Sequence, residues 1–321
     1  MAEKAESYSR FVSDICADVF GEAPRTVLPI LQWGTFHLIF DVVDSSGTPW
    51  IVRVADGETP DFGLQLDAWA GDNLPARGVP VPRVTCLDLS RSRAPFEFAI
   101  VQRAEGTLFA DIARDGPSFP GLVRSLGEIV KRLHTVAVEG FGLIASPNPP
   151  SAEIGRGSCS SWPHYLLRCF DIHVERCRTV GAISDEEAHK ILRLFPQVLK
   201  RLPHRPARLL HGDLGSHNIF VRDGRVSGLI DWEDCVAGDP VYDIAFWGTF
   251  YAQDALPHFL KGYFGDQQSL EDFELRYWLY FLRVALAKTV LRDRLGYVDP
   301  PGQPAASARI QLALRHLHAI I

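Results

Sequence analysis

One stretch, residues 209–234, constrains this chain more than any other, because it gathers several oxygen and nitrogen ligands around a single turn. In its middle the dipeptide Asp223-Gly224 separates the apolar run 219–221 from the run 226–230. Asp-Gly between two such runs is a strong signal for a tight β-hairpin. We therefore expect two antiparallel strands here, with the polar residues of the stretch gathered at the open end of the hairpin.

The hairpin would return Asp231 to the level at which Asn218 leaves, so that a carboxylate and a carboxamide face each other. Such oxygens suit Mg²⁺, which completes its shell with water and phosphate oxygens. Asp213, in the loop just before, is then free to act as a base. An H-x-D-x-x-x-x-N loop followed by a later Asp is the arrangement used for phosphoryl transfer. The alternative interpretation is a polar loop that leads into an ordinary hairpin.

The chain has 321 residues and is 46% hydrophobic, which is enough for two lobes with separate cores. Its net charge of −6 is mild and argues against a nucleic-acid partner. Six cysteines without a C-x-x-C pair favour reduced thiols over a zinc site or disulfides. The first ten residues are polar and charged, and no apolar run approaches membrane-spanning length. We expect a cytoplasmic protein with no secretory signal and no membrane partner.

The beginning of the chain predicts a helix followed by a small antiparallel sheet. Apolar residues recur at helical spacing over residues 11–20, and three β-type runs follow at 27–33, 36–43 and 50–54. Gly34 lies at the first reversal, where a residue without a Cβ could approach phosphates. Most such glycines only make turns, so Gly34 by itself decides nothing.

Arg53 is a charge inside the apolar strand WIVRVAD. A charge at such a position needs a partner, and Asp67 on the following helical segment could supply it. In kinase-like sites a strand lysine contacts the nucleotide phosphates and a helix glutamate holds it. An Arg–Asp pair keeps the reach and offers phosphate a planar fork. The alternative is a solvent-facing arginine and an unrelated surface aspartate.

A further strand over residues 97–101 ends in the polar connector 102–106, which closes with Gly106. Such a strand end before a long helical region marks a boundary between lobes. We place this boundary between residues 1–104 and residues 105–321.

Within the connector, backbone groups of Gln102 and Ala104 could pair with an adenine edge. Beyond it the sequence predicts a loop over residues 145–162 and helices over residues 122–133, 162–177, 184–202, 246–251, 259–264 and 273–295. Five aromatic residues of this region are expected in the core: Trp247, Tyr251, Tyr277, Trp278 and Tyr280. The predicted class is α+β, with a small antiparallel β-rich lobe and a larger, mostly helical lobe.

The segments HGDLGSHN, IDWED and AGDPVYDIAFW together resemble the aminoglycoside phosphotransferase family, a branch of the protein-kinase-like fold. The resemblance extends outward: WGTFHLIFDV is similar to the nucleotide loop, WIVRVAD to the phosphate-contacting strand, ARGVPVPRV to the helix exit and FAIVQRAEG to the hinge. The sequence GSHN in the catalytic loop and an arginine where kinases have a lysine are features most similar to those of hygromycin B phosphotransferases. The resemblance implies a bilobal kinase-like fold, ATP as phosphoryl donor and antibiotic resistance as the outcome.

For individual residues, the resemblance implies that Asp213 is the catalytic base and that His211 braces its loop. Asn218 and Asp231 would hold Mg²⁺ between the β- and γ-phosphates. The implied nucleotide site combines a phosphate-contacting pair, two covering residues and two backbone groups for adenine, namely Arg53 with Asp67, Gly34 with Thr35, and Gln102 with Ala104.

Two aspartates of the GDPVYD segment, Asp239 and Asp243, would mainly buttress the larger lobe. The single glycine of the nucleotide loop and the sequence DWE in place of DFG depart from the protein-kinase pattern. These departures leave ATP as the expected nucleotide and GTP open.

The charge distribution favours a cationic small-molecule acceptor. Between residues 226 and 275 there is one basic residue, Lys261, against ten acidic residues: Asp231, Glu233, Asp234, Asp239, Asp243, Asp254, Asp266, Glu271, Asp272 and Glu274. Such a field would attract a polyamine sugar and raise its association rate. A solvated acidic face is the alternative. The candidate acceptor residues are Glu233, Asp234 and Glu271.

Three hypotheses compete, with a monomer expected in each. The first is an O-kinase of an aminoglycoside or aminocyclitol. The second keeps the fold but phosphorylates a small metabolite such as choline, homoserine or a sugar. The third is a non-catalytic kinase-like binding protein, which the intact Asp213, Asn218 and Asp231 disfavour. A protein kinase is disfavoured because Gly212 replaces the arginine of an H-R-D loop and no A-P-E segment follows.

Overall fold

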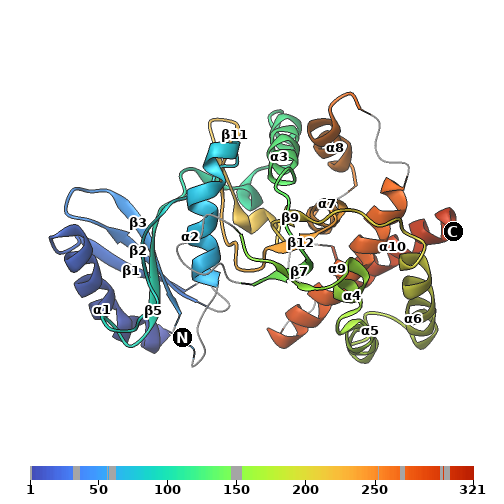
Figure 1. The fold of residues 1–321 in the computed structure, drawn as a ribbon, viewed down its shortest axis with the longest axis horizontal. Helices are drawn as coiled ribbons and strands as arrows, with labels where there is room; N and C mark the ends of the chain where they lie inside the picture. The colour runs from blue at the N-terminus through green and yellow to red at the C-terminus, as the bar shows by residue number, and fades with distance from the viewer. Residues whose placement is uncertain are drawn as a thin grey trace.

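The computed structural model describes residues 2–31, 37–55, 57, 63–145, 154–251, 253–267, 272–296, 299 and 304–321. These residues form a small lobe built on one sheet and a larger lobe that is mostly helical (Figure 1). The predicted α+β class is confirmed. The predicted boundary between residues 104 and 105 falls between the last strand of the small lobe's sheet and the first strand after it, and it stays a prediction.

The small lobe contains a five-stranded sheet in the order β1-β2-β3-β5-β4, in which every neighbouring pair is antiparallel. Its strands are β1 (Thr26–Ile30), β2 (Leu38–Val43), β3 (Pro49–Ala55), β4 (Val84–Asp88) and β5 (Glu97–Gln102). The three strands expected before residue 55 are therefore present, with the predicted antiparallel pairing.

Helices cover both faces of this sheet (Figure 1). On one face α1 (Ala2–Phe20) buries Val12 and Cys16 against the sheet, in a cluster that contains Phe40. On the other face lies α2 (Gly63–Asn73). Its Leu64 packs on the sheet, and its other buried apolar side chains join the core of the larger lobe. This helix therefore packs against both lobes, which suits it to position a side chain at their contact.

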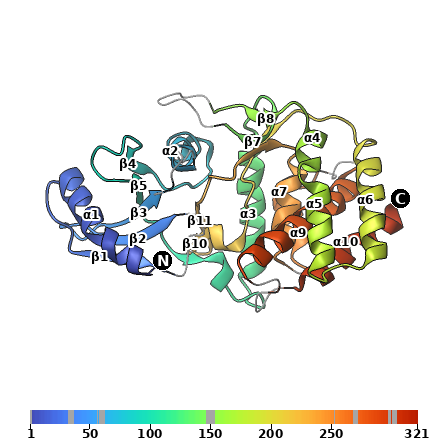
Figure 2. The same cartoon turned by 90° about the horizontal axis from the view of Figure 1, so that it is seen from below.

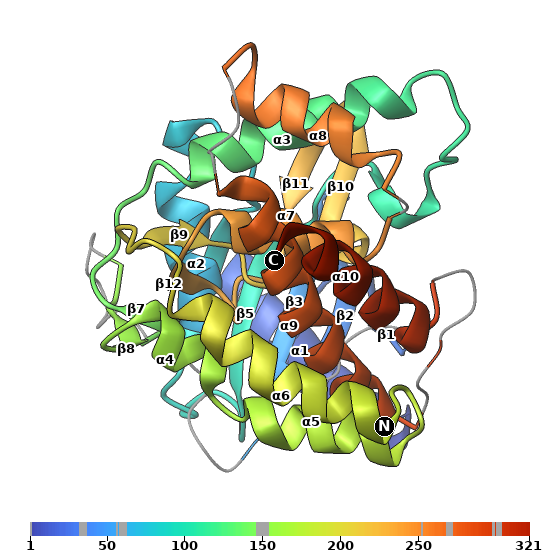
Figure 3. The ribbon, with the colours of Figure 1, turned by 90° about the vertical axis from the view of Figure 1, so that its right-hand side faces the viewer.

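The larger lobe packs its helices around one large apolar core (Figures 2 and 3). Its helices are α3 (Phe119–Leu133), α4 (Trp162–Leu167), α5 (Phe170–Thr179), α6 (Asp185–Leu199), α7 (Val241–Gly248), α8 (Leu256–Phe264), α9 (Phe273–Arg294) and α10 (Ala306–Ile320). None of the helices in the described ranges combines the length and the apolar character that a membrane crossing requires.

Two small sheets lie where the lobes meet. One has the order β11-β10-β6 and the other the order β8-β7-β12-β9. Their strands are β6 (Thr107–Leu108), β7 (Phe141–Ile144), β8 (Gly157–Cys159), β9 (Arg208–Leu210), β10 (Ile219–Arg222), β11 (Arg225–Leu229) and β12 (Val236–Gly238). The predicted hairpin is β10–β11, and the two residues of its turn, Asp223 and Gly224, both have positive φ.

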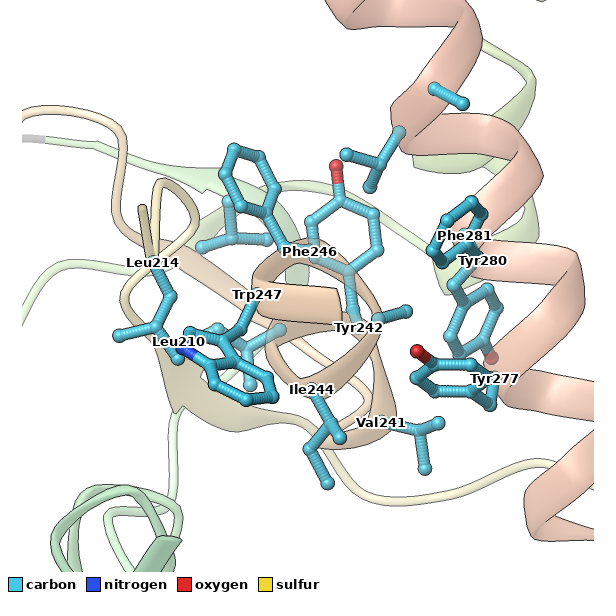
Figure 4. Packing of buried hydrophobic residues seen from close by; sticks show 14 of the residues in the cluster. Leu210, Leu214, Val241, Tyr242, Ile244, Phe246, Trp247, Tyr277, Tyr280 and Phe281 are labelled. Atoms are coloured by element: carbon cyan, nitrogen blue, oxygen red, sulfur yellow. The ribbon is translucent and has the colours of Figure 1, made fainter. Parts of the chain in front are cut away.

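Aromatic and aliphatic side chains of β9, the loop after it, α7 and α9 belong to one buried cluster (Figure 4). Trp247 and Tyr280 are fully buried, and Tyr277 is 1% exposed. The prediction that these aromatic residues belong to the core is confirmed. Their packing gives the loop that follows β9 a rigid support.

Several described elements differ from the predicted ones. Cys169 adopts a left-handed conformation with φ of 54°, which divides the single helix expected over residues 162–177 into α4 and α5. Strand β8 lies inside a segment expected to be a loop. The sequence also gave no prediction for α10, the last helix.

Candidate active site

The loop that follows β9 is held from within the larger lobe by α7. The Asp243 carboxylate accepts the backbone N–H of His211 at 2.7 Å and that of Gly212 at 3.0 Å. Asp243 is itself fully buried, and His134 contacts it at 3.1 Å. These contacts fit the supporting role expected of Asp243, because they fix the loop backbone just before Asp213.

His211 connects the same loop to the end of the hairpin. Its ring is fully buried, and Nε2 donates to the carbonyl oxygen of Ile230 at 3.0 Å. The ring also packs on Trp232, with ring centres 4.7 Å apart. His211 thus lies where the predicted bracing role requires it.

Gly212 occupies a position that no other residue would fit. Its φ is 80°, and a Cβ added there would lie 1.9 Å from the carbonyl oxygen of Asp234. Two segments of backbone therefore touch directly at the loop. This explains in physical terms why the arginine of an H-R-D loop is absent here, which the sequence showed only as a departure from a pattern.

Asp213 points toward two side chains of the turn that precedes β10. Its Oδ2 accepts the amide Nδ2 of Asn218 at 2.9 Å, and His217 Nε2 lies 3.4 Å from the same oxygen. The pairing of Asp213 with Asn218 joins two predicted site residues. His217 was not predicted as a site residue, because a histidine in a polar loop has no distinguishing pattern. Only the turn, which brings its ring next to the residue four positions earlier, shows its role.

The pKa of Asp213 is lowered to about 2. Burial favours the neutral acid, but the hydrogen bond from His217 and the electrostatic influence of His217, Lys288 and His211 outweigh it. The carboxylate is therefore ionised at neutral pH and ready to accept a hydrogen bond from a hydroxyl group.

Asn218 and Asp231 lie at the open end of the hairpin, as predicted. The N–H of Ile230 donates to the Asn218 carbonyl oxygen at 3.0 Å, so Asp231 follows directly after the residue paired with Asn218. Asp231 has a φ of 69°, a conformation that is uncommon for a residue with a side chain and is often found at functional sites. A carboxylate and a carboxamide on adjacent strand ends are a donor set that fits Mg²⁺.

Arg53 and Asp67 form the predicted pair. A guanidinium nitrogen of Arg53 on β3 donates to Asp67 Oδ2 on α2, and the two side chains are 12% and 8% exposed. The other carboxylate oxygen of Asp67 accepts the backbone N–H of Trp232 at 2.9 Å. Burial raises the pKa of Asp67 to about 6, with Arg53 opposing and Asp231 adding to the shift.

The second nitrogen of Arg53 crosses to the larger lobe. It donates to Asp231 at 2.9 Å and to Glu233 at 3.2 Å. His37 lies 3.0 Å from this nitrogen and 3.1 Å from Glu233. Burial would lower the pKa of Arg53, but the three surrounding carboxylates, Asp67 foremost, raise it instead. This group of charges is the point at which the small lobe meets the hairpin.

The other predicted nucleotide residues are placed less completely. The N–H of Gln102 donates to the carbonyl oxygen of Arg83 at 2.9 Å. Ala104 lies over β11, where its Cβ would be 3.3 Å from a Cβ added at Gly228. Gly34 and Thr35 lie outside the described residues.

The predicted acceptor residues are in different surroundings. Glu233 faces Arg53 and His37, whereas Asp234 is exposed to solvent on one side. Partial burial of its carboxyl group, with the negative charges of Asp213, Glu233 and Asp231, raises the pKa of Asp234 to about 7. Glu271 lies outside the described residues.

Much of the acidic run is already paired within the protein. Asp239 contacts Arg276 and the hydroxyl of Tyr280, and Asp272 also pairs with Arg276. Asp266 pairs with Lys261. The count of acidic residues therefore overstates the negative charge that faces a ligand.

The fold is a two-lobed α+β fold, and its lobes meet at an Arg–Asp pair beside a His-Gly-Asp loop. These features define a kinase-like phosphotransferase. Residues 31–279 match the phosphotransferase enzyme family, and the chain belongs to this family. The predicted relationship is confirmed. The described fold is similar to that of a thermostable mutant of aminoglycoside phosphotransferase APH(4)-Ia in its apo form, with a TM-score of 0.67, 19% identity and 97% of each chain covered.

Other relatives agree with this assignment. A ternary complex of the same solved protein with AMP-PNP and hygromycin B has a TM-score of 0.67 at 19% identity and covers 96% of this chain and 97% of that one. Hygromycin-B 4-O-kinase of Escherichia coli is 24% identical over 219 residues, 65% of this chain and 59% of that protein. Viomycin phosphotransferase of Streptomyces vinaceus is 24% identical over 203 residues, which are 58% of this chain and 66% of that protein. The chain thus spans less than two thirds of the length of the hygromycin-B kinase and of the viomycin phosphotransferase.

Proposed function

We propose that this protein transfers the γ-phosphate of Mg-ATP to a hydroxyl group of a small cationic acceptor of the aminoglycoside or aminocyclitol type, with antibiotic resistance as the outcome. The observation that carries the proposal is the contact of Arg53 with Asp231, which are 178 residues apart in sequence and meet beside the Asp213–Asn218 pair. A strand cation, a metal-type donor set and a candidate base thus occupy one site.

In the proposed reaction, the acceptor hydroxyl oxygen forms a bond to the γ-phosphorus while the bond from that phosphorus to the bridging oxygen of ADP breaks. The hydroxyl proton passes to the Asp213 carboxylate. With a pKa of about 2, this carboxylate is too weak a base to ionise an alcohol beforehand. Its main contribution is to orient the hydroxyl and to take the proton late, as expected for a loose transition state.

Arg53 would contact the phosphates, and Asp67 would hold it in position. Gly34 and Thr35 would cover the phosphates, and the backbones of Gln102 and Ala104 would hold adenine. When bound between Asn218 and Asp231, Mg²⁺ would neutralise charge on the β- and γ-phosphates.

A second candidate keeps the reaction but changes the acceptor to a small metabolite of the choline, homoserine or sugar type. The pairing of Asp239 and Asp272 with Arg276, and of Asp266 with Lys261, favours it. These pairs leave fewer free carboxylates than a polycation would use.

The proposal is tested by an assay of diphosphate formation. The purified protein is incubated with ATP or GTP, Mg²⁺ and a panel of acceptors, and the ADP or GDP that is released is measured. The panel should contain hygromycin B, other aminoglycosides, choline, homoserine and simple sugars. We expect ATP-dependent turnover with at least one hydroxyl compound, and hygromycin-type acceptors would separate the first candidate from the second. A protein that binds nucleotide but releases no diphosphate with any acceptor would be a non-catalytic binding protein.

A further inference from the structure

Three buried basic side chains lie on the side of Asp213 that faces away from the small lobe. Lys288 and Arg292 are one turn apart on α9, and Arg309 is on α10, which packs against α9 (Figure 3). Their residues are only 9%, 7% and 2% exposed, respectively. Three cations so close together in a protein interior repel one another and lose hydration, so they are costly unless something compensates them.

Two of these cations lack the hydrogen bonds that burial demands. Within the described part of the chain, neither Lys288 Nζ nor any guanidinium nitrogen of Arg309 has a hydrogen-bond partner. Burial lowers the pKa of Arg309 to about 10, with Arg292 adding to the shift and Asp299 opposing it. Burial also lowers the pKa of Lys288 well below its ordinary value, with Asp213 opposing the shift and the two arginines adding to it, so a bound anion would favour the charged form of both groups. Buried polar groups are nearly always paired in folded proteins, so these donors indicate a partner that the described part of the chain does not provide.

The Lys288 ammonium is connected to the candidate active site by aromatic rings. Its Nζ lies 4.2 Å from the ring centre of Phe246 and 3.0 Å from that of Phe250. The Phe250 ring in turn packs on His217, with ring centres 5.7 Å apart, and His217 reaches Asp213. The ring faces hold the cation through cation–π contacts but accept no conventional hydrogen bond from it. The ammonium therefore lies behind the catalytic loop, close enough to influence Asp213.

We propose that Lys288 and Arg309 bind an anionic oxygen group of the acceptor, a carboxylate or a similar oxyanion, while its hydroxyl group lies against Asp213. This inference rests on the proposed phosphotransfer and specifies its acceptor. The nucleotide phosphates do not account for these cations, since they are expected at Arg53, Asn218 and Asp231 on the other side of Asp213. With Asp234 available for an amine, this site favours a zwitterionic acceptor, which agrees with the homoserine type of the second candidate function and not with the polycationic acceptor of the first.

Binding of an anion can be tested without turnover. The melting temperature is measured with saturating Mg-ADP over a series of sulfate concentrations, with sodium chloride at matched ionic strength as the reference. A ligand that binds only the folded state stabilises it in a saturable manner. We expect a saturable rise in the wild type that is lost in Lys288→Gln and in Arg309→Lys, which keeps the charge but not the planar fork. Arg315→Gln, an exposed arginine on α10, is the matched control. A rise of the same size in all four proteins would overturn the anion site.

The identity of the anionic group is tested with acceptor pairs that differ only in a carboxylate, such as L-homoserine and 3-aminopropan-1-ol. We expect kcat/KM to be higher for the carboxylate member, and Lys288→Gln to lower it by roughly 10- to 100-fold more for that member than for the amino alcohol. Turnover of the neutral or polycationic members with no preference for carboxylates would contradict this inference and leave the proposed function intact. Absence of turnover with every acceptor would contradict the proposed function, while the sulfate result would still decide the anion site.

Discussion

At the scale of single residues, Gly212 shows how closely the loop backbone is packed. Replacing it with alanine should lower the free energy of unfolding by about 3 kcal/mol. The positive φ contributes about 1 kcal/mol, and the contact with the Asp234 carbonyl oxygen contributes about 2 kcal/mol more, because the backbone must move apart. Urea denaturation of wild type and Gly212→Ala measures the difference.

Gly181 provides the matched control, since its φ is 74° and nothing lies within 4 Å of an added Cβ. Gly181→Ala should therefore show only the conformational cost of about 1 kcal/mol. If the two substitutions were equally destabilising, the close backbone contact at Gly212 would not matter energetically.

Asp234 leads to a pH-dependent prediction. Its pKa is raised to about 7, so the carboxyl group is neutral below that pH and charged above it. An amine-bearing acceptor stays positive across this range, and KM for it should fall by about fivefold between pH 6 and pH 8, which corresponds to ~1 kcal/mol of attraction. Steady-state kinetics with the wild type at several pH values measures this change.

Asp234→Asn should remove the change in KM, because the amide does not titrate. Glu274→Gln, at an exposed carboxylate on α9, should keep it. A wild-type pH profile that survives Asp234→Asn would assign the effect to another group.

The residues of the candidate site differ in how much of their environment could be predicted. Arg53 and Asp67 could be paired from sequence, because a charge in an apolar strand must find a partner and few are within reach. His217 and Lys288 could not, since their contacts with Asp213 and with Phe250 depend on a short turn and on the packing of a distant helix. No sequence spacing encodes either distance.

At the scale of elements, α3 and α8 cross with their backbones in direct contact. A Cβ added at Gly127 would lie 2.2 Å from the Phe259 carbonyl oxygen, and one added at Gly262 would lie 2.0 Å from that of Arg124. Gly127→Ala should therefore push the helices apart and destabilise the protein by about 1–3 kcal/mol. Thermal and urea unfolding of the purified variant measure this loss.

Gly121, on the exposed side of α3, has nothing within 4 Å of an added Cβ. Gly121→Ala should stabilise the protein by about 0.5–1 kcal/mol, because alanine restricts the unfolded chain and favours a helix. The same substitution on the same helix is thus expected to have opposite signs at the two positions. A stabilising Gly127→Ala would show that the two helices can separate without cost.

Long elements could be predicted from sequence and short ones could not. Helices α3, α6 and α9 repeat an apolar pattern over several turns, so their existence was evident. Strands β6 and β12 have two and three residues, too few to show an alternation. They exist because their neighbours in space supply hydrogen bonds, which is information that a local pattern does not contain.

At the scale of the whole molecule, the site depends on how the lobes are held together. The N–H of Leu229 donates to the Pro80 carbonyl oxygen at 2.7 Å, and the Ser227 hydroxyl donates to the carbonyl oxygen of Glu105, in the connector between the lobes, at 2.6 Å. Arg53 adds the contact to Asp231. If Asp231 takes a metal, it must share or release Arg53, which would then be free for phosphate. Nucleotide binding is thus expected to exchange a contact between lobes for a contact with ligand.

The central claim is that Asp213 orients and deprotonates an acceptor hydroxyl while separate residues hold Mg-ATP. It is tested most directly by comparing the wild type with Asp213→Ala in two measurements on the same samples, acceptor-dependent ADP release and the affinity for Mg-ATP. We expect Asp213→Ala to lower kcat by at least about 100-fold, the usual contribution of a positioned acid or base, with nucleotide affinity changed by less than about threefold. Turnover close to the wild-type rate in Asp213→Ala would contradict the account.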